Sequence, residues 1–193
     1  MAAALLALAA CVASPTGQTV NPGAAGSQTP TGPTSSVRPV DRQAIRLPGQ
    51  VVTTYDAATD HTQAAFLAPV APVPDLYLYA YGLIAGRAPS SNTSEVFLGV
   101  VSFAGAPSFG ASRPLSISVD GVAVECLGVW STERTDDGRR LESLLCNRTL
   151  NTPALQRMIA AASARVEVRG ITAFDVTPEH KALLRELLRR LTT

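Results

Sequence analysis

The chain has 193 residues, of which 46% are hydrophobic and 16% are charged, so its composition indicates a globular protein rather than a disordered one. Its formal net charge of +1 gives no strongly basic field, and we therefore expect no nucleic-acid partner. About 150 residues remain once the N-terminal segments described below are set aside, which is the size of one domain.

Residues 1–10 form an uncharged run rich in Ala and Leu. The run is too short to cross roughly 30 Å of hydrocarbon, and an apolar stretch followed by small residues is typical of a secretory signal. Its end, Leu8-Ala9-Ala10-Cys11, resembles the lipobox of bacterial lipoproteins. The resemblance implies that the signal is removed before Cys11, that the Cys11 thiol carries a diacylglycerol, and that the new terminus is acylated. Several acyl chains together make a lasting membrane anchor.

The same resemblance implies a location in the bacterial cell envelope. An Asp after the lipidated cysteine commonly favours retention at the inner membrane of Gram-negative bacteria, so Val12 favours the outer membrane there. Residues 11–45 are mostly Ser, Thr, Pro, Gly and Ala, a composition that cannot bury enough surface to offset the entropy of ordering. We expect a flexible tether over 11–45 and a globular domain over 46–193. The alternative is a disordered tail with no tethering role.

Regular structure is predicted to begin near Gln50. Apolar and β-branched patterns predict four strands in the first half of the domain, at residues 51–55, 62–67, 76–84 and 95–103. Residues 68–75 contain three prolines and read as an extended connector. The strand at 95–103 is apolar at both parities, so we expect it to be central in the sheet and covered on both sides.

The clearest local pattern is a hairpin over residues 115–127. Asp120-Gly121 is a favoured type I′ pair, and a two-residue turn there places Val119 opposite Val122. Six residues then share one face, which we expect to be buried: Leu115, Ile117, Val119, Val122, Val124 and Cys126.

A second hairpin is expected over residues 129–146, and its cysteine bears on a disulfide. A two-residue turn at Asp137-Gly138 pairs Cys146 with Val129, three residues from Cys126 and about 10 Å away along the strand. A bulge or a longer loop would close that gap. With Cys11 lipidated, exactly two thiols remain in an oxidising compartment, so we predict a Cys126–Cys146 disulfide.

Helical periodicity appears late in the chain. Helices are predicted at 153–163 and from Thr177 to Leu191, with strands at 165–170 and 171–176 between them. The fold class predicted is α+β, with an antiparallel sheet or flattened sandwich of about seven or eight strands and two C-terminal helices.

Two groups of residues are candidate sites. Asp56, Asp60 and His61 lie within six residues and could supply acid–base chemistry, although Asp at a turn more often bonds its own backbone. His180, in the first turn of the last helix, is expected at the surface.

The second group is aromatic. Tyr77, Tyr79 and Tyr81 share one face of a strand and, together with Trp130, could form a recognition surface. The alternative, which we favour, is that this row lies at the edge of the core.

No familiar nucleophile, phosphate-loop or zinc motif occurs, so no cofactor or metal is expected. We expect a non-enzymatic binding or scaffolding module that contacts the membrane through its lipid and an envelope protein or the cell wall through its domain. The alternatives are an envelope hydrolase that uses the acidic and His residues of 56–61, and an accessory subunit of an envelope assembly machine.

Overall fold

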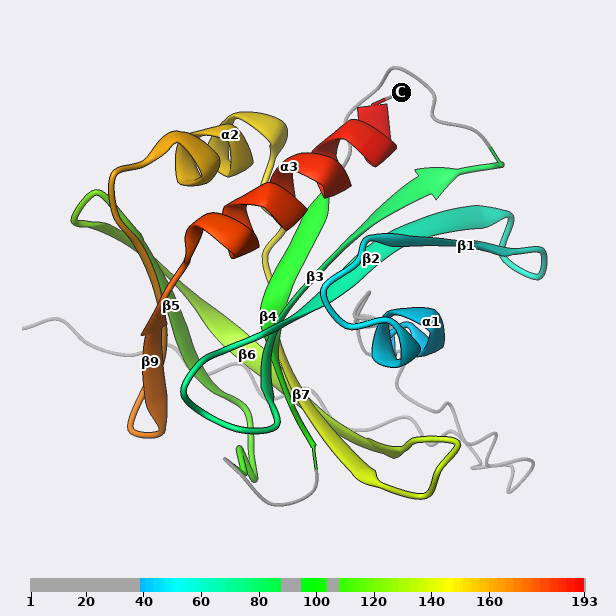
Figure 1. The fold of residues 1–193 in the computed structure, drawn as a ribbon, viewed down its shortest axis with the longest axis horizontal. Coiled ribbons are helices and arrows are strands. Elements are labelled where there is room, and N and C mark those ends of the chain that lie inside the picture. The colour runs from blue at the N-terminus through cyan, green and yellow to red at the C-terminus, as the bar shows by residue number, and fades with distance from the viewer. Residues whose placement is uncertain (1–38, 88–94, 104–107, 193) are drawn as a thin grey trace, which may run out of the picture. The chain divides into compact units, whose positions relative to one another are not determined.

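The fold is that of a computed structural model, which describes residues 39–87, 95–103 and 108–192. The predicted signal over 1–10, the predicted lipidation site Cys11, Val12 and most of the predicted tether lie outside the described residues. Within them the chain forms nine antiparallel strands in one sheet and three helices, which confirms the α+β prediction (Figure 1). In chain order the elements are α1 (Arg42–Arg46), β1 (Val52–Asp56), β2 (His61–Pro69), β3 (Leu76–Ala85), β4 (Val96–Phe103), β5 (Arg113–Val119), β6 (Val122–Arg134), β7 (Arg140–Cys146), α2 (Thr152–Ala160), β8 (Ala164–Val168), β9 (Thr172–Asp175) and α3 (Pro178–Thr192).

The strand order in the sheet is β1-β2-β3-β4-β7-β6-β5-β8-β9. Most neighbours in the sheet are also neighbours in the chain, and the exceptions are the pairs β4–β7 and β5–β8. All eight residues of β4 are buried, so its predicted central position is confirmed. Among the described elements, no helix is both long and apolar enough to cross a membrane.

The sheet carries a core on each face. Helices α2 and α3 pack together over one face, and α1 packs on the other (Figure 1). The absence of a side chain at Gly82 lets α3 approach β3 closely, because a Cβ there would collide with the Leu191 side chain. The apolar stripe of α3 thus packs on the sheet, as its periodicity predicts.

Regular structure begins earlier than the predicted start near Gln50. Helix α1 is capped by Asp41, whose carboxylate accepts hydrogen bonds from the backbone N–H groups of Gln43 and Ala44. The Asp41 N–H in turn donates to the Tyr79 hydroxyl at 3.2 Å, and Ala44 is fully buried. These tertiary contacts, rather than helix propensity, draw the end of the predicted tether into the fold.

The β5–β6 hairpin has the predicted register. Val119 pairs with Val122, Ile117 with Val124 and Leu115 with Cys126. Its two turn residues, Asp120-Gly121, have φ angles of 47° and 81°, as a type I′ turn requires.

Asp137-Gly138 do not form a two-residue turn, and the longer loop that the predicted disulfide requires is present instead. Arg134 pairs with Arg140 across a five-residue loop, which is closed by hydrogen bonds between the backbones of Thr135 and Arg139 and of Gly138 and Thr135. The longer loop shifts the register by one residue, so Cys146 lies opposite Gly128 and not Val129.

This shift explains the disulfide. Cys126 and the position opposite Cys146 are two residues apart instead of three, so both cysteines lie on the same face of the sheet. Their Cα atoms are 5.6 Å apart, and the two residues are joined by a disulfide.

The expectation that His180 is a surface residue is also wrong. Its side chain is buried, with Nδ1 accepting a hydrogen bond from the Thr177 N–H at 3.1 Å and Nε2 lying 2.9 Å from the Pro69 carbonyl oxygen. Since a carbonyl can only accept, the ring proton lies on Nε2. His180 therefore ties the start of α3 to the end of β2.

Candidate functional site

An apolar depression lies between the tip of the β5–β6 hairpin and α2. We call it the hairpin groove. Its volume of about 420 Å³ is within the range of about 300–1,000 Å³ typical of ligand pockets. The groove is lined largely by apolar side chains, and its lining residues are Ile117, Val119, Asp120, Val122, Val124, Leu150, Ala154, Arg157, Met158, Ala160 and Ala161.

The hairpin face that we expected to be buried is buried only at its base. Leu115, Ile117 and Cys126 are covered by the core, but Val122 is 70% exposed and Val124 is 47% exposed. The alternation of residues predicts correctly which side chains share a face, but it does not predict how far the core extends along the hairpin. Two large apolar side chains therefore stand in solvent beside an apolar groove.

On one side, the same end of β6 pairs with no strand that the structure describes. β6 pairs with β7 only over residues 128–134, because β7 ends at Cys146. The last contact is the hydrogen bond from the Asn147 N–H to the Leu127 carbonyl at 2.9 Å, after which the chain leaves for α2. Residues 122–126 thus form an edge that no described strand covers, and we call this segment the free edge.

The register determines which backbone groups the free edge presents. The closing pair of a two-residue hairpin is hydrogen-bonded, so Val122, Val124 and Cys126 direct their N–H and C=O groups to β5. Ala123 and Glu125 direct theirs away from β5, as does Leu127, whose carbonyl meets Asn147. The outward groups of Ala123 and Glu125 bond to none of the described residues.

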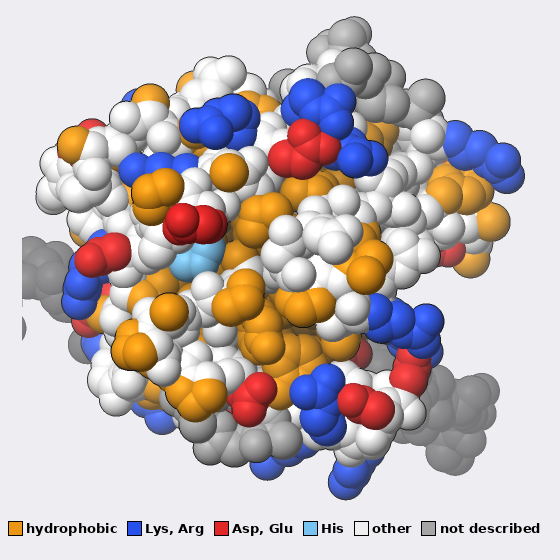
Figure 2. Space-filling model, in the orientation of Figure 1, with side chains coloured by type: hydrophobic (Ala, Val, Ile, Leu, Met, Phe, Trp, Pro, Cys, Tyr) orange, Lys and Arg blue, Asp and Glu red, His pale blue; other side chains and the backbone are white. Residues whose placement is uncertain are grey.

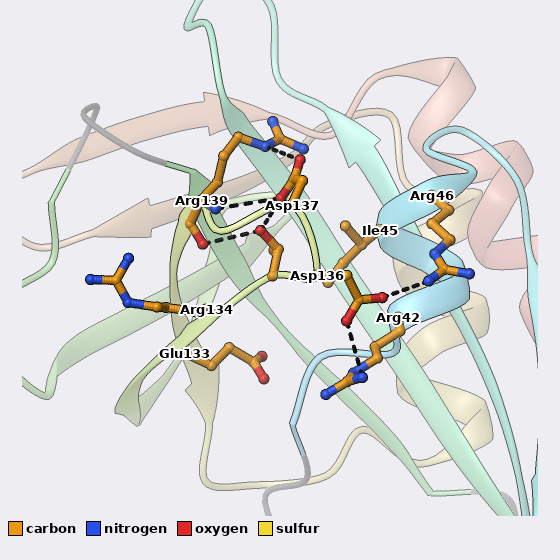
Figure 3. Close-up of a pocket in the computed structure, with 9 residues that line it drawn as sticks. Arg42, Ile45, Arg46, Glu133, Arg134, Asp136, Asp137 and Arg139 are labelled. Atoms are coloured by element: carbon orange, nitrogen blue, oxygen red, sulfur yellow. Dashed lines mark hydrogen bonds and ion pairs between the residues drawn. The ribbon is translucent and has the colours of Figure 1, made fainter.

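A second depression, of about 280 Å³, lies between α1 and the β6–β7 loop, and its lining is charged. Figure 3 shows Asp136 between two arginines of α1, with its carboxylate 3.0 Å from Arg42 and 2.5 Å from Arg46. Across the loop, Arg139 pairs with Asp137 at 2.7 Å. We call this depression the charged cleft. Its charges largely neutralise one another, and its ion pairs hold α1 to the β6–β7 hairpin.

The deepest carboxylate of the charged cleft is Glu133, which accepts a hydrogen bond from the Val40 N–H at 3.2 Å. Burial raises the pKa of the Glu133 carboxyl, and the Val40 hydrogen bond and the nearby Arg42 oppose that rise only in part. Glu133 therefore also serves to hold the entry of the chain into the domain.

Glu142, a buried carboxylate on the α2/α3 face of β7, is not among the site residues predicted from the sequence. It accepts hydrogen bonds from the backbone of Phe109 at 2.8 Å, from Ser108 at 3.0 Å and from the Trp130 indole at 3.4 Å, and it pairs with Arg140 at 2.7 Å. Burial on its own raises the pKa of the Glu142 carboxyl, but the hydrogen bonds outweigh burial and the pKa lies below its ordinary value. The signal in the sequence is the alternation of β7, which places Glu142 on the same strand face as Leu144 and Cys146.

The predicted aromatic surface is not assembled. Tyr79 and Tyr81 are fully buried under the α1 face and Tyr77 is partly buried, whereas Trp130 packs on the opposite face of the sheet. The Tyr79 hydroxyl also accepts a hydrogen bond from Gln63 at 3.1 Å, and burial raises the pKa of its phenol. The tyrosine row is core, as the favoured alternative predicts.

The predicted acid–base group lies at the β1–β2 turn and makes local contacts. Asp56 accepts a hydrogen bond from the Ala58 N–H at 2.9 Å, and Asp60 accepts one from the Tyr55 hydroxyl at 2.8 Å. The Nδ1 atom of His61 lies 2.5 Å from the carbonyl oxygen of Thr59. These contacts follow the turn interpretation and give the hydrolase alternative no support.

Figure 2 shows acidic and basic side chains interspersed with apolar ones on the face that carries α2 and α3, so that face carries no field of a single sign. Comparisons of the chain with family models, with curated proteins and with solved structures yield no match. The candidate site therefore rests on the geometry of the hairpin groove and the free edge.

Proposed function

We propose that this chain is a lipid-anchored protein of a bacterial envelope, and that its domain is a non-enzymatic module that binds a protein partner through the hairpin groove. The anchor rests on the lipobox resemblance of Leu8 to Cys11, and Val12 favours the outer membrane in a Gram-negative organism. The Cys126–Cys146 disulfide supports export, because disulfides persist mainly in oxidising compartments.

The observation that carries the binding role is the exposure of Val122 and Val124 beside an apolar groove. An apolar patch rimmed by polar residues is typical of a protein-interaction site. The backbone of the free edge lies next to this patch. A polypeptide can hydrogen-bond to that backbone and also cover the apolar patch, whereas a small apolar ligand can only cover the patch. An accessory role in an assembly machine differs from this proposal only in the identity of the partner.

The groove is tested by site-specific photocrosslinking in living cells. A photoreactive phenylalanine analogue at Val122 is compared with the same analogue at Arg185, an exposed position on α3. We expect a discrete protein adduct from position 122 only, and we expect Val124→Glu in the same chain to abolish it. Adduct formation at neither position, or equally at both, would contradict the binding role.

The anchor is tested separately with a clickable fatty acid. Wild-type cells are expected to label the protein, and the Cys11→Ser variant is expected to remain unlabelled. Equal labelling of the two chains refutes the lipid anchor and leaves the groove proposal standing.

A further inference from the structure

We infer that the partner binds by strand addition, as an extended segment with apolar residues at alternate positions and a carboxylate that meets Arg157. The inference rests on the proposed function and names the kind of partner that the hairpin groove takes. Three features of the site support this mode of binding: the backbone of the free edge, the side chains beside it and Arg157, the one cation of the groove lining.

The free edge supplies the hydrogen bonds of an additional strand. Ala123 and Glu125 are two residues apart, and both direct an N–H and a C=O away from β5. That spacing is the one with which an edge strand pairs with an extended peptide. All residues from 122 to 125 are exposed, so the described part of the chain leaves this edge accessible.

The side chains set the chemistry of the added segment. Val122 and Val124 share the face of β6 that borders the hairpin groove. Side chains of an added strand alternate between the two faces of the sheet, so every second residue of the partner lies over the groove. Apolar residues at those positions cover the two valines, whereas polar residues there leave them in contact with water.

The charge of the groove points to a carboxylate. Arg157 lines the groove from α2, and its guanidinium bonds to none of the described residues. Asp120 also lines the groove, but its carboxylate already accepts a hydrogen bond from the Ser163 N–H at 2.9 Å. A carboxylate on the partner, from an acidic side chain or from a chain terminus, therefore finds a cation with no competing partner among the described residues.

A second copy of this chain fits the same site less well. Residues 122–126 of a second copy would bring one charged side chain, Glu125. That charge pairs with Arg169 at 2.8 Å. Because Glu125 and Asp120 are both engaged, an identical edge brings no spare carboxylate to Arg157.

The test uses the full chain carrying Cys11→Ser and synthetic peptides of the sequence acetyl-TLTLTL. Three forms are compared: one with a free terminal carboxylate, one with an added Asp and an amidated end, and one neutral amide. We expect both carboxylate forms to bind about tenfold more tightly than the neutral amide, and Arg157→Gln to remove that difference. Tighter binding of only one form identifies the source of the carboxylate.

Strand addition is isolated by backbone methylation. A carboxylate peptide that is N-methylated at alternate residues keeps its side chains but loses its donors on one edge, and we expect it to bind at least about tenfold more weakly. The Ala123→Pro variant, which lacks the outward N–H, is expected to show the same loss with the unmethylated peptide.

Three results would overturn the inference. They are equal binding of the methylated and unmethylated peptides, no binding of any peptide at millimolar concentration, and self-association of the chain through Val124 that excludes the peptides. Since the crosslinks from Val122 are measured independently in cells, any of these results leaves the proposed binding role distinguishable from the mode of binding.

Discussion

The two ends of β6 are built differently. Its C-terminal half pairs with β7, is linked by Glu133 to Val40 just before α1, and is bordered by ion pairs between Asp136 and two arginines of α1. Its N-terminal half exposes Val122 and Val124 and presents a backbone edge that no described strand covers. In one half of β6 the backbone pairs with β7, whereas in the other half it pairs only with β5 among the described strands. We expect a partner to bind at this second half.

The difference arises from strand length. β6 has thirteen residues and β7 has seven, so the shorter strand can cover only part of the longer one. The Cys126–Cys146 disulfide lies at the point where the coverage ends. It therefore fixes the boundary between the paired half and the free edge.

The largest expected effect compares two residues that pair on the same face of the hairpin. Ile117→Ala removes a buried side chain and is expected to lower the free energy of unfolding by about 2–5 kcal/mol. Val124→Ala, directly opposite, is expected to cost less than about 0.5 kcal/mol because that side chain is half exposed. Urea unfolding measures both, and equal losses would show that the tip belongs to the core.

The disulfide is expected to come next. Replacing both Cys126 and Cys146 with Ala opens a loop with a sequence separation of 20 residues and is expected to cost about 3 kcal/mol. Wild-type protein unfolded in the presence of a reductant serves as the matched control and should lose the same amount. An unchanged urea midpoint in both samples would contradict a stabilising bridge.

Glu142 lies opposite Thr132 in the paired half of β6, and its contribution to stability is expected to depend on pH. Glu142→Gln is expected to cost about 2 kcal/mol at pH 7, because it weakens several hydrogen bonds to a charged acceptor. The folded-state pKa lies below the ordinary value of 4.5, so this stabilisation is complete above that value and is lost as the pH falls through the folded-state pKa. The difference between the two proteins should therefore shrink on acidification below about pH 4.5, whereas Glu167→Gln, at an exposed position, should show little difference at any pH.

The smallest effect is expected at the charged cleft. Asp136→Asn removes the partner of Arg42 and Arg46, and because these charges are exposed we expect a loss below about 1 kcal/mol that salt reduces further. Thermal unfolding at low and high ionic strength measures this loss. A large loss of stability that does not depend on salt would contradict the view that the charged cleft only attaches α1 to the hairpin.

The sequence predicts the regular elements well and the site only in part. The Asp120-Gly121 pair is sufficient to predict the register of β5–β6, because the turn type determines which residues face each other. Local pattern does not reveal α1, since that helix of five residues depends on contacts with the distant Tyr79. It also does not reveal the free edge, which follows from where β7 ends and not from the residues of β6.

Residue-resolved amide hydrogen exchange of the full chain without a partner tests most directly whether residues 122–126 form a free edge. The N–H groups of Ala123 and Glu125 should exchange rapidly, while those of Ser131 and Glu133, which point to β7 on the same side of the same strand, should be protected. Slow exchange at Ala123 and Glu125 in the monomeric protein would mean that the chain already covers its own edge, and the proposed binding surface would be contradicted.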